Sequence, residues 1–267
     1  NADRSQNKRD HVKVPGEYAK IMLPELTFPY LIPGQEVLLD DGKIHLKIVE
    51  KAENVTENGG ENTQEKRYFA KVLWGGLLKS RKSAALPGAK IYPPTLTNSD
   101  LANIKIAKEM GVTGVMQPFV RDHSDLECVK EALREAGAED IRLFAKIENM
   151  DGVRKLEELL PAADEIVIAR GDLGNAVHLW DLPGVQRQIA EKCRAAGKPF
   201  MVVTQMLASM ERSPVPTRAE VNDIFHAVMD GAASIMVTGE TAVGDYPVEV
   251  IRYMVNTVRS AEKEKNR

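Results

Sequence analysis

The 267-residue sequence has few cysteines, few aromatic residues and no long apolar run. Its two cysteines, Cys128 and Cys193, do not form a pair with metal-ligand spacing, and such low cysteine usage is typical of a reducing compartment. No apolar stretch reaches the roughly 18 residues that a membrane-spanning helix requires, and the N-terminal residues contain no apolar signal core. These absences argue against a disulfide-stapled domain and against a membrane protein, so we expect a cytoplasmic location.

Neither sign of charge dominates the chain. Lys and Arg number 36 and Asp and Glu number 39, which gives a formal net charge of −3. A nucleic-acid-binding domain or a protein of anionic membranes normally carries an excess of basic residues. Three histidines, His123, His178 and His226, fall on different expected elements without ligand spacing, so we interpret them as structural. The near-equal numbers of basic and acidic residues favour a small molecule as the partner, and we expect binding to neither nucleic acid nor membrane.

From residue 98 onward, helical and strand patterns alternate. We expect helices at 98–110, 125–136, 151–160, 182–196, 217–230 and 247–263, and strands at 114–119, 141–147, 165–169, 199–204 and 233–237. Strands that alternate with helices of about 10–15 residues predict parallel βαβ units with right-handed crossovers. A closed (β/α)₈ barrel needs more strands than these. The fold class is therefore α/β, and residues 89–267 are expected to form an incomplete TIM-type (β/α) barrel portion.

The first third of the chain has a different texture. Residues 1–12 are polar and predict an N-terminal tail, whereas residues 13–88 predict a small antiparallel β module. Strand patterns occur at 19–23, 36–49 and 68–74, and the Asp41-Gly42 pair inside the second run predicts a hairpin turn. The polar segment 54–66 predicts an exposed loop.

Charged residues follow two consecutive apolar strands of the expected barrel portion. Lys146 and Glu148 are two positions apart, so their side chains leave one strand on the same face, and Asp172 follows the next strand. The carboxyl ends of parallel barrel strands carry the active site. Two carboxylates there suit Mg²⁺ or Mn²⁺, which complete their coordination with water and substrate oxygens. A surface ion pair of little energetic value is the alternative for Lys146 and Glu148 taken alone.

Six short motifs occur in order along the second part of the chain. They are Lys-Ile-Glu-Asn at 146–149, Ala-Arg-Gly-Asp-Leu-Gly at 169–174, Gly-Lys-Pro at 197–199, Thr-Gln-Met-Leu-Ala-Ser-Met at 204–210, Pro-Thr-Arg-Ala-Glu-Val at 216–221, and Thr-Gly-Glu-Thr-Ala at 238–242 with Gly-Asp-Tyr-Pro at 244–247. Together they resemble the pyruvate kinase family. The resemblance covers most of residues 35–262, and residues 75–88 resemble the end of that family's lid, its B domain.

This resemblance implies a glycolytic phosphotransferase that converts phosphoenolpyruvate and ADP to pyruvate and ATP through a metal-stabilised pyruvate enolate. It assigns Lys146 to the transferring phosphoryl group, and Glu148 and Asp172 to the Mg²⁺ or Mn²⁺ ion. Gly171 and Asp172 would hold the substrate carboxylate through backbone N–H groups. Thr204 would lie at the methyl carbon and relay a proton through water.

Weaker assignments follow from the same resemblance. Thr238 and Glu240 correspond to the pocket wall, and Arg81 and Lys82 to basic lid residues that reach a nucleotide phosphate. A K⁺ ion is also implied, although its ligands are not found in this sequence. Pro118 stands where the family usually has a serine, which removes a hydroxyl and an N–H group.

Segments that resemble the family's first three barrel strands and its C-terminal regulatory domain are not found. We therefore expect the sheet edge to be completed by further segments, by a partner polypeptide or by a homo-oligomer. Two alternative functions remain open from the residues: a metal-dependent 2-oxo-acid decarboxylase or lyase that uses only the enolate half, and a degenerate, non-catalytic family member. Arg218 and Glu220 are equally compatible with first-turn helix charges and with a subunit interface.

Overall fold

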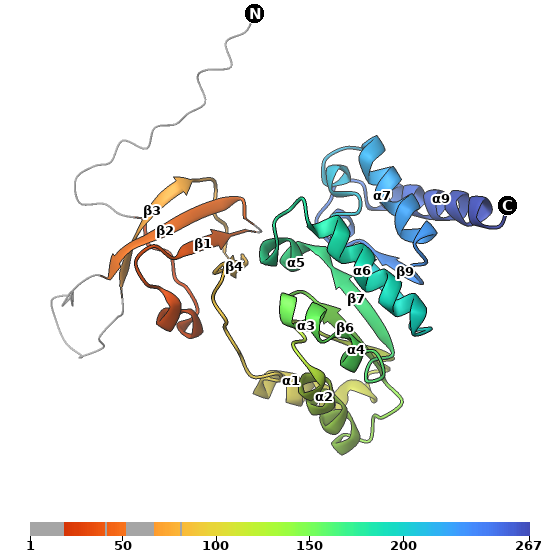
Figure 1. Cartoon of the computed structure of the whole chain (residues 1–267), viewed down its shortest axis with the longest axis horizontal. Helices are drawn as coiled ribbons and strands as arrows, with labels where there is room; N and C mark the ends of the chain where they lie inside the picture. The colour runs from red at the N-terminus through yellow and green to blue at the C-terminus, as the bar shows by residue number, and fades with distance from the viewer. Residues whose placement is uncertain (1–18, 41, 52–66, 81) are drawn as a thin grey trace, which may run out of the picture.

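The computed structural model describes residues 19–40, 42–51, 67–80 and 82–267. The described residues form one antiparallel and one parallel sheet, joined by an extended segment (Figure 1). The antiparallel sheet has the order β3-β2-β1-β4 and consists of β1 (Glu36–Leu39), β2 (Ile44–Lys51), β3 (Tyr68–Trp74) and β4 (Ala84–Ala85). The parallel sheet has the order β5-β6-β7-β8-β9 and consists of β5 (Gly114–Gln117), β6 (Arg142–Ile147), β7 (Glu165–Ala169), β8 (Phe200–Val203) and β9 (Ser234–Met236).

The small sheet forms because its strands alternate apolar and polar residues. Val37, Leu39, Ile44, Leu46 and Ile48 bury one face in a separate core. Leu39 pairs with Ile44, which confirms the predicted hairpin; Asp41 of its turn, the loop at 54–66 and the tail at 1–12 lie outside the described residues.

The strand predicted at 19–23 is wrong. These residues belong to no helix or strand, and the 3₁₀ helix η1 (Glu25–Tyr30) follows them. Pro24 directly after the run and Pro29 inside η1 lack the N–H groups that a strand ladder needs, and Met22 is 97% exposed. The apolar residues at 19–23 therefore do not form a strand with one buried face.

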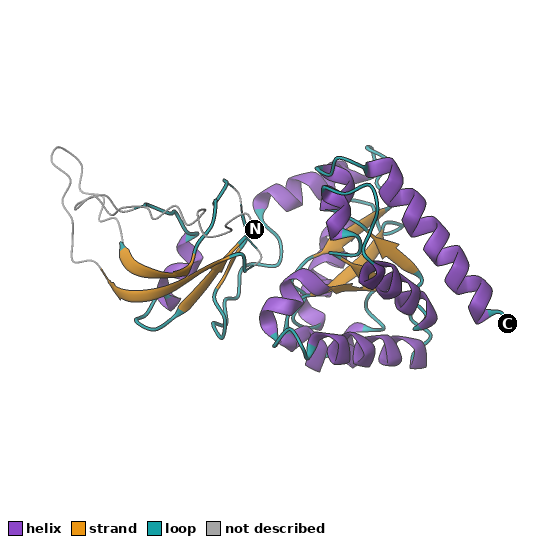
Figure 2. Cartoon of the chain, turned by 90° about the horizontal axis from the view of Figure 1, so that it is seen from above, coloured by secondary structure: helices purple, strands orange, loops and turns teal. Residues whose placement is uncertain are grey.

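The helices of the second part pack around the parallel sheet (Figure 2). They are α1 (Asn98–Ala107), α2 (His123–Glu135), α3 (Met150–Arg154), α4 (Leu156–Leu159), α5 (Arg170–Ala176), α6 (Leu182–Ala195), α7 (Arg218–Met229), α8 (Gly239–Ala242) and α9 (Pro247–Lys265), with the 3₁₀ helix η2 (Ala208–Glu211) before α7. All five predicted strands are confirmed. The helix predicted at 151–160 is interrupted at Lys155, and α8 was not predicted. No helix in the described ranges has the length and apolar character to cross a bilayer.

The parallel strands are nearly continuous apolar runs because both faces of the sheet are buried: the helices pack on one face, and strand residues such as Val167, Ala169 and Val203 form a small cluster on the other. Every residue of the central strand β7 is buried. Parallel pairing places Ile147 beside Ile168 and Ala169 beside Val203, so β6, β7 and β8 end at one edge. The fold is α/β, a partial TIM-type barrel sheet with a small antiparallel β module, and the candidate site residues follow these aligned strand ends.

Candidate active site

Glu148 is the most constrained residue at this edge. Its side chain is only 2% exposed, and the Lys146 ammonium lies 2.9 Å from Oε1. The backbone N–H of Phe119, in the loop after β5, donates to Oε2 over 2.7 Å. Because a backbone N–H holds one carboxylate oxygen and the Lys146 ammonium pairs with the other, Glu148 is oriented before any ligand arrives. The predicted proximity of Lys146 and Glu148 is confirmed, and the buried carboxylate excludes a solvated surface pair.

Asp172 lies in the first turn of α5, which begins directly at the end of β7. A carboxylate in this position is stabilised by the unpaired N–H groups of the first helical turn. The neighbouring Gly171 N–H donates to Thr204 Oγ1 over 2.9 Å. A substrate carboxylate at Gly171 would therefore compete with the Thr204 hydroxyl for this donor.

Thr204 connects the ends of β7 and β8. Its hydroxyl donates to the Val203 carbonyl over 2.6 Å while it accepts the Gly171 N–H. The φ angles of Thr204 and Gln205 are +74° and +51°, which is rare for residues with a side chain and unusual for a β-branched one. Such conformations persist only where the surroundings impose them, and they cluster at functional sites.

Arg170 supplies part of this constraint, and the sequence analysis missed it. Its guanidinium donates to the Thr204 carbonyl over 2.7 Å and to Asp223 on α7 over 2.6 Å. A positive side chain directly before Gly171 was visible as part of the Ala-Arg-Gly-Asp motif. Its partner 53 positions later could not be inferred from spacing.

The donor set fits a hard divalent cation. Glu148 and Asp172 provide carboxylate oxygens, and a carboxylate has about four acceptor positions, of which two on Glu148 are used in this structure. Mg²⁺ is commonly bound by one or two carboxylates and otherwise by water and substrate oxygens. Across the described residues, no cluster of three or more His, Cys, Asp or Glu side chains could hold a metal alone. Glu148 and Asp172 could contribute two carboxylates to a divalent site whose other ligands are water and substrate oxygens.

Glu240 is buried, but its oxygens serve the backbone. It accepts the N–H of Leu207 over 3.2 Å and the N–H of Thr238 over 2.8 Å. Thr238 itself is exposed. Glu240 thus ties the end of the sheet to the segment after β8, and its placement in a pocket wall stays a prediction.

Of the two lid residues assigned to a nucleotide phosphate, Arg81 lies outside the described residues. Lys82 is in an ion pair with Asp40, with 2.8 Å between Nζ and Oδ1. The hydrogen bond from Lys82 lowers the pKa of Asp40 below its ordinary value. The β1–β2 turn also approaches α5, since a Cβ placed on Gly42 would lie 3.8 Å from Asn175 Oδ1. The turn of the small module therefore lies close to the helix that carries Asp172.

Glu220 has a clear structural role. Its carboxylate accepts from the N–H and hydroxyl of Ser209 over 2.7 and 2.6 Å, and it completes a capping box with Thr217 at the start of α7. The first-turn interpretation is confirmed for Glu220. A hollow of about 490 Å³ lies between α7 and α9, and its lining consists of Pro216, Thr217, Arg218, Val221, Asn222, Phe225 and Tyr253, all distinct from the candidate site residues.

Comparison with known proteins gives a consistent match. The family model "Pyruvate kinase, barrel domain" matches residues 6–251. The chain is 38% identical over 233 residues to a pyruvate kinase of Bacillus licheniformis, and 40% identical over 233 residues to one of Geobacillus stearothermophilus. These alignments cover 87% and 86% of this chain and 38% of each relative. A pyruvate kinase of Chlamydia trachomatis serovar D is 35% identical over 242 residues, which are 91% of this chain and 47% of the relative. The chain thus spans less than half the length of these curated relatives.

Proposed function

Because this chain belongs to the pyruvate kinase family, we propose that it acts in phosphoryl transfer between phosphoenolpyruvate and ADP, giving pyruvate and ATP. The observation that carries the proposal is the buried Glu148 carboxylate, fixed between Lys146 and the Phe119 N–H at the carboxyl edge of the parallel sheet. A buried carboxylate that is already oriented needs no reorganisation during the reaction. Such pre-oriented charges contribute strongly to stabilisation of a transition state.

Lys146 is the proposed phosphoryl-binding residue. Its ammonium is partly exposed and rests on Glu148 Oε1, so it can turn toward an anion while its strand stays fixed. During transfer of a phosphoryl group, negative charge is spread over the equatorial oxygens, and catalysis consists mainly of positioning and electrostatic stabilisation. Lys146 provides a positive charge at that place.

Glu148 and Asp172 would hold a Mg²⁺ or Mn²⁺ ion. Such an ion, when bound, would offset the negative charge on the substrate's carboxylate and enolate oxygens. The residues themselves orient the substrate, because Glu148 is fixed and Asp172 projects from the first turn of α5. K⁺ is proposed as a second cofactor from family membership alone, and no described residue is assigned to it.

Thr204 is the proposed proton-relay residue. When the phosphoryl group leaves the enol oxygen, a proton must be added at the methyl carbon of the product. The Thr204 hydroxyl is a weak acid, so it acts through a water molecule at that carbon; to donate to this water it turns from the Val203 carbonyl and the Gly171 N–H, its partners in this structure. Gly171 would supply a backbone N–H to the substrate carboxylate when the Thr204 hydroxyl turns away.

The lid assignments and the cellular setting belong to the same proposal. We assign Arg81 and Lys82 to the nucleotide phosphates, with the Asp40 carboxylate pairing with Lys82 until a phosphate replaces it. Thr238 and Glu240 are assigned to the pocket wall. We further infer a cytoplasmic enzyme and a homo-oligomer, and Cys128 and Cys193 as free thiols accord with a reducing compartment.

Metal binding tests the site. Because only two protein carboxylates contribute, Mn²⁺ should bind weakly alone and more tightly with oxalate, whose two oxygens close a chelate ring. Calorimetry of Glu148→Gln and Asp172→Asn should show that each variant has a weakened but measurable oxalate-dependent Mn²⁺ affinity. Asp151→Asn is the matched control, because this carboxylate lies near the site but pairs with Arg154. Unchanged affinity in either site variant would show that the metal assignment is wrong.

A second experiment separates Lys146 from Thr204. Lys146→Met should abolish ATP formation but preserve the metal-dependent exchange of pyruvate methyl protons with solvent, whereas Thr204→Val should slow both reactions. Loss of a contact that stabilises transition-state charge commonly costs about 10²–10³ in rate. Equal loss of both reactions in Lys146→Met would contradict this division of roles.

A further inference from the structure

Glu148 is oriented by a loop that belongs to a different strand. Residues 118–122 connect β5 to α2, and the Phe119 N–H in this loop donates to Glu148 Oε2 over 2.7 Å. Phe119 has a φ of +52°, in the left-handed region that residues with a side chain rarely adopt. This conformation is strained and persists only where the surrounding structure imposes it. Something must therefore hold the loop.

One set of contacts comes from the end of β6. The Val120 N–H donates to the Lys146 carbonyl over 3.2 Å, and the Asn149 side chain donates to the Val120 carbonyl over 3.1 Å. Gly152 allows this approach, because a Cβ at that position would lie 2.5 Å from the Val120 carbonyl oxygen. These contacts hold Val120, the residue after Phe119, against the chain on either side of Glu148.

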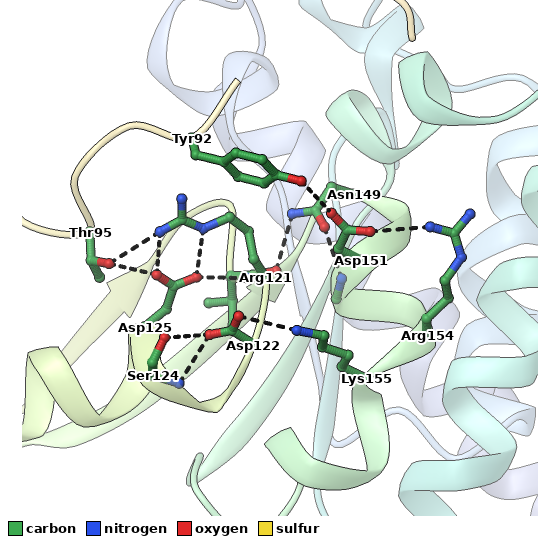
Figure 3. A network of polar contacts seen from close by, with 12 residues as sticks. Tyr92, Thr95, Arg121, Asp122, Ser124, Asp125, Asn149, Asp151, Arg154 and Lys155 are labelled. Atoms are coloured by element: carbon green, nitrogen blue, oxygen red, sulfur yellow. Dashed lines mark hydrogen bonds and ion pairs between the residues drawn. The ribbon is translucent and has the colours of Figure 1, made fainter. Parts of the chain in front are cut away.

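The second set of contacts comes from Asp125, in the first turn of α2 (Figure 3). Asp125 is 2% exposed and accepts four hydrogen bonds. Arg121 donates from its backbone N–H over 2.8 Å, from Nε over 2.9 Å and from Nη2 over 2.5 Å, and Thr95 Oγ1 donates over 2.5 Å. Arg121 also reaches the Pro93 carbonyl over 3.2 Å. Asp125 therefore fixes both the backbone and the side chain of the residue two positions after Phe119.

The charge state of Asp125 is maintained by these donors. Burial acts to raise the pKa of Asp125, but the hydrogen bonds from Arg121 and Thr95 outweigh it and lower the pKa to about 2. Asp125 is thus an anion at every physiological pH. A permanent, buried anion paired with a guanidinium is a rigid anchor with defined geometry.

We propose that Asp125 is a positioning residue for the metal ligand Glu148, acting through Arg121 and the backbone N–H of Phe119. This inference rests on the proposed function, because it requires Glu148 to bind the divalent ion. Residues that orient a metal ligand commonly change metal affinity by 10–100-fold when they are replaced. We therefore expect Asp125→Asn, which keeps the shape of the side chain, to weaken oxalate-dependent Mn²⁺ binding by about 10-fold or more.

The Mn²⁺ titrations use the intact natural protein and its variants in the presence of oxalate. They are carried out well below the unfolding temperature. Asp122→Asn is the matched control. Asp122 is a carboxylate three positions away that pairs with Lys155 and caps α2, and it acts on Arg121 only by charge attraction, whereas Asp125 accepts hydrogen bonds from Arg121. Figure 3 shows Asp122 facing Lys155 and Ser124 while Asp125 faces Arg121. Asp122→Asn should leave Mn²⁺ affinity within about twofold, against the 10-fold range for a ligand-orienting residue.

A double-mutant cycle distinguishes positioning from a general loss of stability. If Asp125 acts through Glu148, Asp125→Asn should change Mn²⁺ affinity little in a Glu148→Gln background, because interacting residues are not additive. A purely structural effect would be the same in both backgrounds. Arg121→Lys is a milder second variant if Asp125→Asn does not fold; it keeps the charge but loses the planar fork, so it should also weaken Mn²⁺ binding.

The outcomes separate the two proposals. If Glu148→Gln does not weaken Mn²⁺ binding, the metal site itself is wrong. If Glu148→Gln weakens binding but Asp125→Asn and Arg121→Lys match the Asp122→Asn control, the metal site stands and the positioning role is refuted. The positioning role would also be refuted if Asp125→Asn weakened Mn²⁺ binding by the same factor in the natural protein and in the Glu148→Gln background.

Discussion

The Asp125 network also makes a quantitative prediction about stability. Asp125 has an ordinary pKa of 3.8, which the native structure lowers to about 2. A depression of nearly two pKa units corresponds to roughly 2–3 kcal/mol of stabilisation of the native state at neutral pH. Breaking a buried ion pair by removal of one partner typically costs about 3–5 kcal/mol. The two estimates agree that Asp125→Asn should lower the free energy of unfolding by roughly 3 kcal/mol at pH 7.

The sign of the pH dependence follows from the direction of the shift. A carboxyl group whose pKa is lower in the native state contributes its full stabilisation above its unfolded pKa, and this contribution declines as pH falls toward the native pKa. The window for Asp125 therefore runs from about pH 4 down to about pH 2. The difference between the natural protein and Asp125→Asn should be constant from pH 7 to pH 5 and smaller at pH 3.

Urea unfolding followed by far-UV circular dichroism, which reports the helices around the parallel sheet, measures this difference. Asp122→Asn serves as the control, because its Lys155 partner is about half exposed and surface pairs contribute about 0–1 kcal/mol. A loss below about 1 kcal/mol in Asp125→Asn, or a loss that does not change between pH 5 and pH 3, would refute this account of the network.

Three further outcomes test other parts of the structure. Glu240→Ala removes the acceptor of two backbone N–H groups, so thermal or urea unfolding should show a loss of roughly 2–4 kcal/mol. Burial acts to raise the pKa of Glu220, but hydrogen bonds from Ser209 and the helix cap lower it; Glu220→Gln should therefore cost about 1 kcal/mol at pH 7 and less as pH falls below 4. Burial raises the pKa of the Cys193 thiol to about 12, so a thiol reagent at pH 8 should modify Cys128 alone until the protein unfolds.

The parallel sheet was predictable because its signals are local. Each strand is a short apolar run, and the helices between the strands have clear periods and capping residues, such as Thr97 before α1 and Thr217 before α7. The motif positions then placed Lys146, Glu148 and Asp172 at one edge, since parallel strands end together. The β module was harder to predict, because the segment 19–23 has the composition of a strand but belongs to neither sheet.

The contacts that orient the site residues were not predictable, because their partners are distant in sequence. Arg170 meets Asp223 on α7, and Asp125 meets Thr95 before α1. An ion pair of this kind is defined by the crossing of elements in space and has no fixed spacing along the chain. Glu240 was assigned to a pocket wall from its position, and only the structure shows that its oxygens accept from backbone groups.

The backbone donor to Glu148 is the clearest example. An N–H group carries no residue identity, so no motif marks Phe119 as the partner of a metal ligand. Pro118 offers a partial signal after the fact. It has no N–H group, and the first donor available after β5 is therefore the N–H of Phe119. The proline that departs from the family pattern thus leaves the Glu148 hydrogen bond intact, because that bond depends on the next residue. What Pro118 removes is a hydroxyl, so its effect is expected on substrate contacts at this edge and not on the orientation of Glu148.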